Sequence, residues 1–81
     1  MKITVKFWSY FRDLTECEET LLEVNEGKTL GDLHATVMTQ FPKLAEMKNS
    51  TLKAVGVDYQ TDEFVLSDGD EVSLFPPVQG G

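Results

Sequence analysis

The fold is decided by one stretch in the middle of the chain, TLGDLHATVMTQFP at residues 29–42. It carries the only strong helix signal in the sequence. Thr29 is a favourable N-cap residue, and Asp32, three positions later, is close to a capping box. His34 lies on the apolar stripe, and we expect a packed or edge residue rather than a metal ligand, because no second His or Cys has suitable spacing. The stripe recurs at helical spacing until Pro42 ends it, and comprises Leu30, Leu33, Val37, Met38 and Phe41.

Strand patterns lie on both sides of this helix. Residues 2–8 alternate between apolar and polar side chains, as a half-buried strand requires. Residues 9–14 break the alternation and predict a turn or short helix, and 42–51 predict irregular chain with at most a helical turn near 44–47. The further strands are predicted at 18–24, 52–57, 59–61 (short, at an edge) and 71–75.

This order predicts an α+β fold in which a mixed sheet of about four to five strands packs on one main helix. The first and last strands can lie parallel at the sheet centre, joined through the helix by a right-handed crossover. That arrangement is the ubiquitin-like β-grasp. We expect a single domain over 1–81, with a flexible tail from about residue 76.

Composition restricts the classes of function. The net charge of −7 makes nucleic acid an unsuitable partner, because phosphate contacts need clustered Lys and Arg. The single cysteine, Cys17, excludes an internal disulfide. No signal-peptide pattern and no run long enough to cross a bilayer is present. We therefore expect a cytoplasmic protein without a membrane partner.

The last residues form the candidate functional tail. The segment FPPVQ at 75–79 has no charged side chain, and Gly80 and Gly81 follow it. Because glycine lacks a Cβ atom, this end can enter a narrow channel and present the α-carboxylate of Gly81 unhindered. The two prolines stiffen the exit from the last strand. The tail comprises Pro76, Pro77, Val78, Gln79, Gly80 and Gly81.

No other residues indicate chemistry. The acids at 16–19 and 68–71 are typical of turns and solvated surface, and Asp68-Gly69-Asp70-Glu71 lacks the spacing of a calcium loop. No catalytic triad, phosphate-binding glycine loop or metal cluster is found. The sequence therefore predicts no active site of its own, no metal and no bound cofactor.

Three aromatic residues form a candidate partner-binding surface. Alternation in the last strand turns Val72 and Leu74 inward, and Ser73 and Phe75 outward. Trp8 is outward-facing by the same rule, and a parallel neighbouring strand would place it near Phe75. Tyr59 joins them if the preceding turn brings it to that face. The competing interpretation is that these rings fold back onto the edge of the domain itself.

These residues resemble the small sulfur-carrier subunits of molybdopterin synthase. The strongest match is LSDGDEVSLFPPVQGG at 66–81, which is similar to that family's DGDEVAFFPPVxGG ending. A weaker match is FWSYFRDL at 7–14, similar to its FFAxxRELxG segment. The chain differs at Glu16, where the family commonly has glycine, and at Gly56, where an Asn is common.

The resemblance implies a specific chemistry at Gly81. An adenylating, E1-like activating enzyme would use ATP to form an acyl-adenylate on its carboxylate. A sulfur donor, a cysteine desulfurase or a rhodanese-like protein, would displace AMP and leave a C-terminal 1-thioglycine. The tail would then deliver this sulfur to cyclic pyranopterin monophosphate in the large catalytic subunit. The family forms a heterotetramer of two small and two large subunits.

Three alternatives stay open at this point. The thiamine-thiazole pathway uses sulfur carriers of the same fold and ending, although Phe75-Pro76-Pro77 is closer to the molybdopterin branch. A ubiquitin-like modifier would be conjugated to target proteins through Gly81. A plain β-grasp binding module would have an inert tail.

Overall fold

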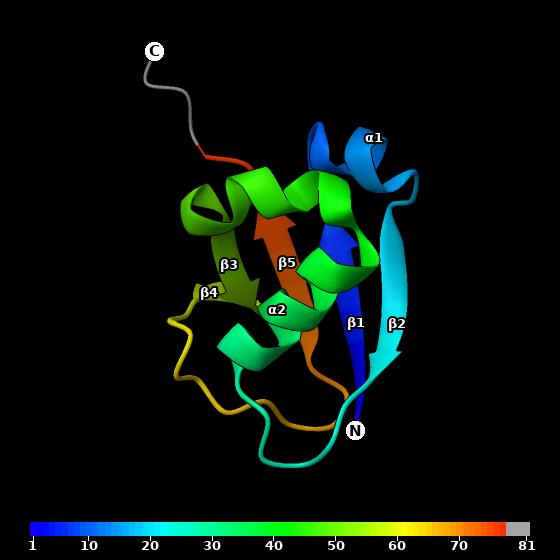
Figure 1. The fold of residues 1–81 in the computed structure, drawn as a ribbon. Helices are drawn as coiled ribbons and strands as arrows, with labels where there is room; N and C mark the ends of the chain where they lie inside the picture. The colour runs from blue at the N-terminus through cyan, green and yellow to red at the C-terminus, as the bar shows by residue number, and fades with distance from the viewer. Residues whose placement is uncertain (78–81) are drawn as a thin grey trace.

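The protein folds as one five-stranded mixed sheet with helices against one face (Figure 1). The structure is a computed structural model and describes residues 1–77. The strand order across the sheet is β2-β1-β5-β3-β4. The elements are β1 (Lys2–Phe7), α1 (Phe11–Thr15), β2 (Glu19–Glu23), α2 (Leu30–Gln40), the 3-10 helix η1 (Pro42–Ser50), β3 (Leu52–Val55), β4 (Asp58–Tyr59) and β5 (Glu71–Phe75).

The terminal strands β1 and β5 pair in parallel at the sheet centre, with Val5 opposite Val72 and Phe7 opposite Leu74. The other strand pairs are antiparallel. The predicted β-grasp arrangement is therefore confirmed. Because β5 runs parallel to β1, its last residue lies at the end of the sheet opposite to the N-terminus (Figure 1).

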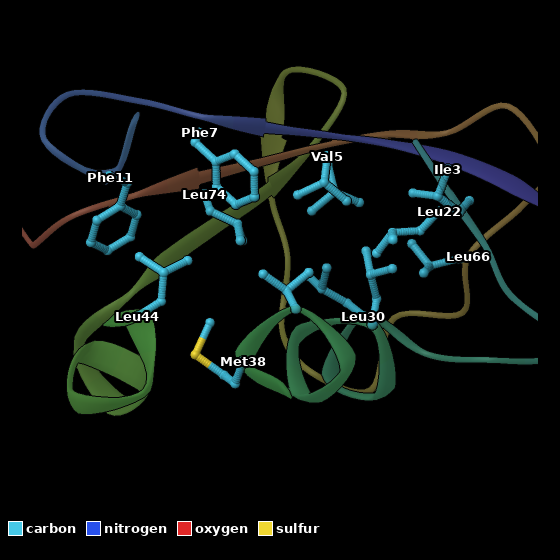
Figure 2. Close-up of a cluster of buried hydrophobic side chains, with 13 residues drawn as sticks. Ile3, Val5, Phe7, Phe11, Leu22, Leu30, Met38, Leu44, Leu66 and Leu74 are labelled. Atoms are coloured by element: carbon cyan, nitrogen blue, oxygen red, sulfur yellow. The ribbon is translucent and has the colours of Figure 1, made fainter. Parts of the chain in front are cut away.

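The core lies between α2 and the inner face of the sheet (Figure 2). Phe7 and Phe41 meet edge to face with ring centroids 5.1 Å apart, which joins the end of β1 to the end of α2. The stripe residues within α2 are buried as their spacing predicted, and Phe41, directly after the helix, is half-buried against the core. The buried core comprises Ile3, Val5, Phe7, Phe11, Leu22, Leu30, Leu33, Val37, Met38, Leu44, Leu66, Val72 and Leu74.

The first turn of α2 has all its amides satisfied. The Thr29 hydroxyl accepts from the Asp32 N–H at 3.2 Å, and the Asp32 carboxylate accepts from the Thr29 N–H at 3.0 Å, which completes the predicted capping box. The Leu30 and Gly31 amides donate to carbonyls of Phe64 and Asp62, at 2.8 and 3.0 Å. The loop before β5 thus covers the start of the helix, and no amide is left there for an anion.

Three segments differ from the sequence prediction by more than one residue at either end. The segment after α2 is a nine-residue 3-10 helix, η1, and not irregular chain with a single turn. Only Leu44 in it is buried, so it has too little apolar periodicity for the sequence to reveal it. Strand β3 ends at Val55 rather than at residue 57, because Gly56 takes a left-handed conformation at φ +62° and starts the hairpin turn. Strand β4 then occupies 58–59 rather than 59–61.

The acidic turn before β5 is a structural element. The Asp68 carboxylate accepts from the Lys2 N–H at 2.7 Å, and the Gly69 N–H donates to the Lys2 carbonyl at 2.9 Å. The Asp70 carboxylate accepts from the Ser67 N–H at 2.8 Å. These bonds attach the turn to the start of β1 and set the register of the two central strands. They give Asp68 and Asp70 the turn role that the sequence predicted.

Candidate functional site

The three predicted aromatic residues form one cluster on the outer face of the sheet, opposite α2. The Trp8 and Phe75 rings stack with centroids 5.7 Å apart and planes at 15°. Tyr59 meets Phe75 edge to face, with centroids 6.2 Å apart. Trp8 is 41% exposed and Tyr59 is 67% exposed, whereas Phe75 is half-buried between them. We call Trp8, Tyr59 and Phe75 the aromatic surface.

Strand pairing brings these rings together from distant parts of the chain. Trp8 directly follows β1, and its N–H donates to the Leu74 carbonyl at 3.2 Å, which extends the parallel pairing by one residue. Ser9 then takes a left-handed conformation at φ 55° and turns the chain into α1. Tyr59 lies opposite Ala54, which in turn lies opposite Ser73. The turn at Gly56 therefore places Tyr59 on the predicted face.

Ser73 corrects one part of the prediction. It lies on the outer face, in register with Lys6 and Ala54, but it is only 5% exposed. A short side chain in the centre of a sheet face is covered by its longer neighbours. Alternation predicts the face on which a residue lies, but not the height of the side chains around it.

The exit of the tail adjoins the aromatic surface. Pro76 and Pro77 follow Phe75 directly and are half-buried. The predicted tail residues Val78, Gln79, Gly80 and Gly81 lie outside the described residues, and so does the expectation of a flexible end. The described residues thus place an aromatic surface immediately before the proposed reactive end of the chain.

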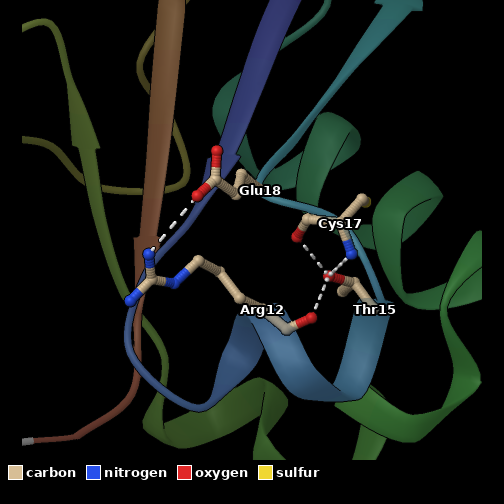
Figure 3. Close-up of polar contacts among 4 residues, drawn as sticks. All are labelled: Arg12, Thr15, Cys17 and Glu18. Carbon is tan, nitrogen blue, oxygen red and sulfur yellow. Dashed lines mark hydrogen bonds and ion pairs between the residues drawn. The ribbon is translucent and has the colours of Figure 1, made fainter.

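A second group of polar contacts lies where α1 joins β2 (Figure 3). The Arg12 guanidinium lies 3.7 Å from the Glu18 carboxylate, and both side chains are exposed. The Thr15 hydroxyl donates within 3.0 Å of the Phe11 and Cys17 carbonyls and also accepts from the Cys17 N–H at 3.4 Å. These bonds fix the backbone of Cys17, whose free thiol is half-buried. They explain the local shape of the loop.

His34 is packed and does not lie at an edge, which decides between the two positions that the sequence left open. It is 3% exposed, and its Nε2 atom is the only buried side-chain nitrogen or oxygen without a hydrogen-bond partner among the described residues. Burial lowers the pKa of His34 to about 4, and the positive charge of Lys53 acts in the same direction. Within residues 1–77 no group of three or more His, Cys, Asp or Glu side chains could hold a metal ion. The helices in that range are also too short or too polar to cross a membrane.

Comparison with known proteins identifies a family. The profile of the ThiS family matches residues 5–81. A protein from Chlamydomonas reinhardtii, named as a molybdopterin synthase sulfur carrier subunit, is 30% identical over the full length of both chains. Small archaeal modifier protein 3 from Haloferax volcanii is 29% identical, also over the full length of both.

Solved structures show the same fold. A Pyrococcus furiosus protein described as a candidate subunit 1 of molybdopterin converting factor is 30% identical, with a TM-score of 0.88 over 96% of this chain and 99% of that one. A complex of subunits 1 and 2 of molybdopterin-converting factor from Helicobacter pylori contains a chain that is 27% identical. That chain matches with a TM-score of 0.71 over the full length of both.

Proposed function

The chain belongs to the ThiS family, and on that premise we propose that it is a sulfur carrier in the synthesis of molybdopterin. Relatives named as sulfur carrier subunits of molybdopterin synthase support this role. One structural observation carries the proposal: Phe75 lies between Trp8 and Tyr59 and directly precedes Pro76 and Pro77. A partner that binds the aromatic surface would receive the tail in its own active site.

Under this proposal the reactive group is the α-carboxylate of Gly81. A carboxylate is a poor electrophile, so an E1-like activating enzyme transfers AMP from ATP to it and releases pyrophosphate. The terminal sulfur of a persulfide on a donor of the cysteine desulfurase or rhodanese type attacks the carbonyl carbon, and AMP leaves. A second thiol then cleaves the resulting acyl disulfide and is itself oxidised to a disulfide with the donor cysteine. The product is a C-terminal 1-thioglycine, whose sulfur is a stronger nucleophile than the oxygen that it replaces.

The loaded tail then serves as a co-substrate. In the active site of a large subunit its sulfur attacks cyclic pyranopterin monophosphate, and that subunit supplies the acid and base groups. The small chain is not itself a catalyst in this scheme and binds no cofactor. The product needs two sulfur atoms, so two carriers are used for each product or one carrier is recharged. The Helicobacter pylori complex of subunits 1 and 2 supports a large-subunit partner.

The geometry explains why the tail leaves the sheet where it does. The ring of each proline fixes φ, and Pro77 also restricts the residue before it to extended conformations. The backbone from Phe75 to Pro77 is therefore restricted to extended conformations where the chain leaves β5. Stiffening of the first two tail residues reduces the entropy lost when a partner binds the tail.

The decisive experiment is the intact mass of the chain after incubation with ATP, an activating enzyme and a sulfur source. We expect a gain equal to the exchange of one oxygen for sulfur, and no gain when Gly81 is deleted. A chain that stays unchanged with a demonstrably active cognate enzyme would contradict the proposal. Transfer of the sulfur to cyclic pyranopterin monophosphate by a large subunit would distinguish this pathway from thiazole synthesis.

A second candidate function is conjugation to proteins. The relative from Haloferax volcanii is named as a small archaeal modifier protein, and adenylation of the terminal carboxylate is common to both routes. Conjugates of high molecular weight that disappear when Gly81 is deleted would support this function. Sulfur loading without such conjugates would restrict the chain to carrier chemistry.

A further inference from the structure

Strand β2 forms an open edge of the sheet. In Figure 1 it is the last strand on the side of β1, and no described element lies beyond it. Two contacts beside the β1–β2 ladder define its hydrogen-bond pattern. Met1 and Val24 exchange both of their N–H···O bonds, at 2.7 and 2.9 Å, and the Phe7 N–H donates to the Glu18 carbonyl at 2.8 Å. Even-numbered residues of this segment therefore bond to β1.

The odd-numbered residues of β2 consequently direct their backbone groups away from the sheet. Glu19, Leu21 and Glu23 each present one N–H and one C=O along the free edge. None of these groups makes a backbone hydrogen bond outside the ladder within residues 1–77. An extended chain placed alongside β2 would find a regular row of donors and acceptors.

The side chains of the same three residues lie on the outer face of the sheet. Leu21 is 59% exposed, which is unusual for a leucine at the centre of a strand. Glu19 and Glu23 flank it and are exposed as well. The edge therefore displays an acidic–apolar–acidic pattern at every second residue. Side chains on the same face of a neighbouring strand have the same spacing, so they would lie directly opposite these three residues.

Strand β1 shows which sequence fits this pattern. It presents Lys, Thr and Lys to the outer face, in the register Lys2–Glu23, Thr4–Leu21 and Lys6–Glu19. Lys6 directs its Nζ atom to Glu71, at 3.4 Å. Neither Glu19 nor Glu23 has an ion pair among the described residues. Both carboxylates thus remain open to cations on the outer side of β2.

A second copy of this chain does not fit the edge. Antiparallel pairing of two β2 strands about Leu21 would set Glu19 of one copy against Glu23 of the other. Like charges directly opposite one another destabilise a strand pair. The same charges favour a partner strand with basic residues at those positions.

We propose that the free edge of β2 is a docking site for an extended segment of another protein, with an apolar residue flanked two positions away on each side by Lys or Arg. The segment adds a sixth strand beside β2, its backbone pairs with the three odd-numbered residues, and its basic side chains contact Glu19 and Glu23. This surface consists of different residues from the aromatic surface, so the inference does not depend on the proposed function.

The test titrates the isotope-labelled full chain with a short capped peptide whose centre is Lys-Thr-Val-Thr-Lys, followed by NMR of the backbone amides. We expect the largest shifts at Glu19, Leu21 and Glu23. The double variant Glu19→Lys/Glu23→Lys should bind about tenfold more weakly. The control Glu46→Lys/Glu63→Lys has the same net charge and alters two exposed acids elsewhere, so it should retain most of the affinity.

A second peptide tests the backbone pairing itself. N-methylation of the amides that would face β2 leaves its charge unchanged and removes its donors, so binding should be lost. Equal binding of the methylated peptide, or shifts distributed over other acidic surfaces, would show only general attraction between charges and overturn the proposal. No binding would mean that the acids merely protect the edge, and concentration-dependent shifts at β2 without peptide would identify a second copy as the occupant.

Discussion

At the scale of the residue, two features that the sequence does not reveal affect stability: the backbone conformation of Glu16 and the buried ring nitrogen of His34. Glu16 ends α1 in the left-handed conformation, at φ 61° and ψ 25°. His34 buries a nitrogen without a partner. The sequence predicted a packed or edge position for His34, but side-chain spacing does not show whether its ring nitrogens find hydrogen-bond partners. It also placed Glu16 in a solvated turn without revealing the strain there.

Replacing Glu16 with glycine should stabilise the protein by about 0.5–1 kcal/mol. The left-handed conformation costs a residue with a Cβ atom roughly 1–2 kcal/mol, part of which is offset by the larger entropy of glycine in the unfolded chain. Chemical denaturation of Glu16→Gly and Glu16→Ala measures this. The alanine variant removes the same charge but retains the Cβ atom, so its free energy of unfolding should equal that of the original chain. Equal stability of the two variants would contradict the explanation.

His34 should make the protein less stable as the pH falls. Its pKa is lowered from 6.5 to about 4 by burial, so the native state excludes a proton that the unfolded chain binds. The stability is therefore complete above about pH 6.5 and is lost as the pH falls towards 4. The charges that face the ring are Lys53 and Lys48, which oppose protonation, and Asp62, which favours it.

The variant His34→Leu tests this dependence. It removes both the titrating group and the unpaired nitrogen. Between about pH 7 and pH 5 the free energy of unfolding of the original chain should fall by about 2 kcal/mol relative to the variant. Both proteins are compared by urea denaturation at each pH. The difference between them removes the contribution of the carboxylates that they share to the pH dependence of stability. Parallel curves would show that the ring finds a partner when protonated.

At the scale of the element, the sequence predicted α2 and its start almost completely, because capping and apolar periodicity are local. It did not predict η1, whose stability depends on Leu44 inserting into the core from an otherwise exposed segment. Nor did it reveal that residues 61–66 lie against the N-terminus of α2. That contact depends on Gly31, where an added Cβ atom would lie 2.9 Å from the Cβ of Asp62 and 3.2 Å from its carbonyl oxygen.

Replacing Gly31 with alanine should therefore destabilise the protein, by about 1–3 kcal/mol, although alanine is the better helix former. The loop would have to move away from the helix, with loss of the Gly31 N–H bond to Asp62 and strain on the ion pair of Asp62 with Lys53, at 3.1 Å. Thermal unfolding measures the loss. The matched control is Ala35→Gly at an exposed position of the same helix. It should lower the free energy of unfolding only by the difference in helix propensity between alanine and glycine.

A second substitution separates steric conflict from other causes. Asp62→Gly removes the nearest atom, so Gly31→Ala should be less costly in that background than in the original chain. If the two substitutions were additive, the close approach would not be the reason for the glycine.

At the scale of the whole molecule, the topology could be predicted because few arrangements satisfy this order of strands and one helix. The convergence of Trp8 and Phe75 followed from the parallel central strands, whereas that of Tyr59 required knowledge of the turn at Gly56. The open edge at β2 was not predicted, since exposure of a strand edge depends on what lies beside it.

Replacing Phe75 with alanine should weaken binding to the two proposed partners, a large subunit and an activating enzyme, by about 2 kcal/mol, close to thirtyfold. The ring is half-buried and stacks on Trp8, so the loss of stability should be smaller, about 1 kcal/mol. Calorimetric titration with each partner gives the affinity. Val65→Ala, at an exposed apolar residue away from the aromatic surface, should bind normally. Unchanged affinity of the Phe75 variant for both partners would exclude the aromatic surface as the docking site.

The parallel pairing of β1 with β5 has a practical consequence for experiments. It sets Met1 at one end of the sheet and Pro77 at the other. A fluorophore, affinity tag or solid support coupled before Met1 would thus stand at the opposite end of the sheet from the aromatic surface and the start of the tail. An amide link there keeps an N–H to donate to the Val24 carbonyl, which the amino group of Met1 contacts at 2.7 Å. Probes should be attached at the N-terminus, because any group added after Gly81 would block the chemistry under study.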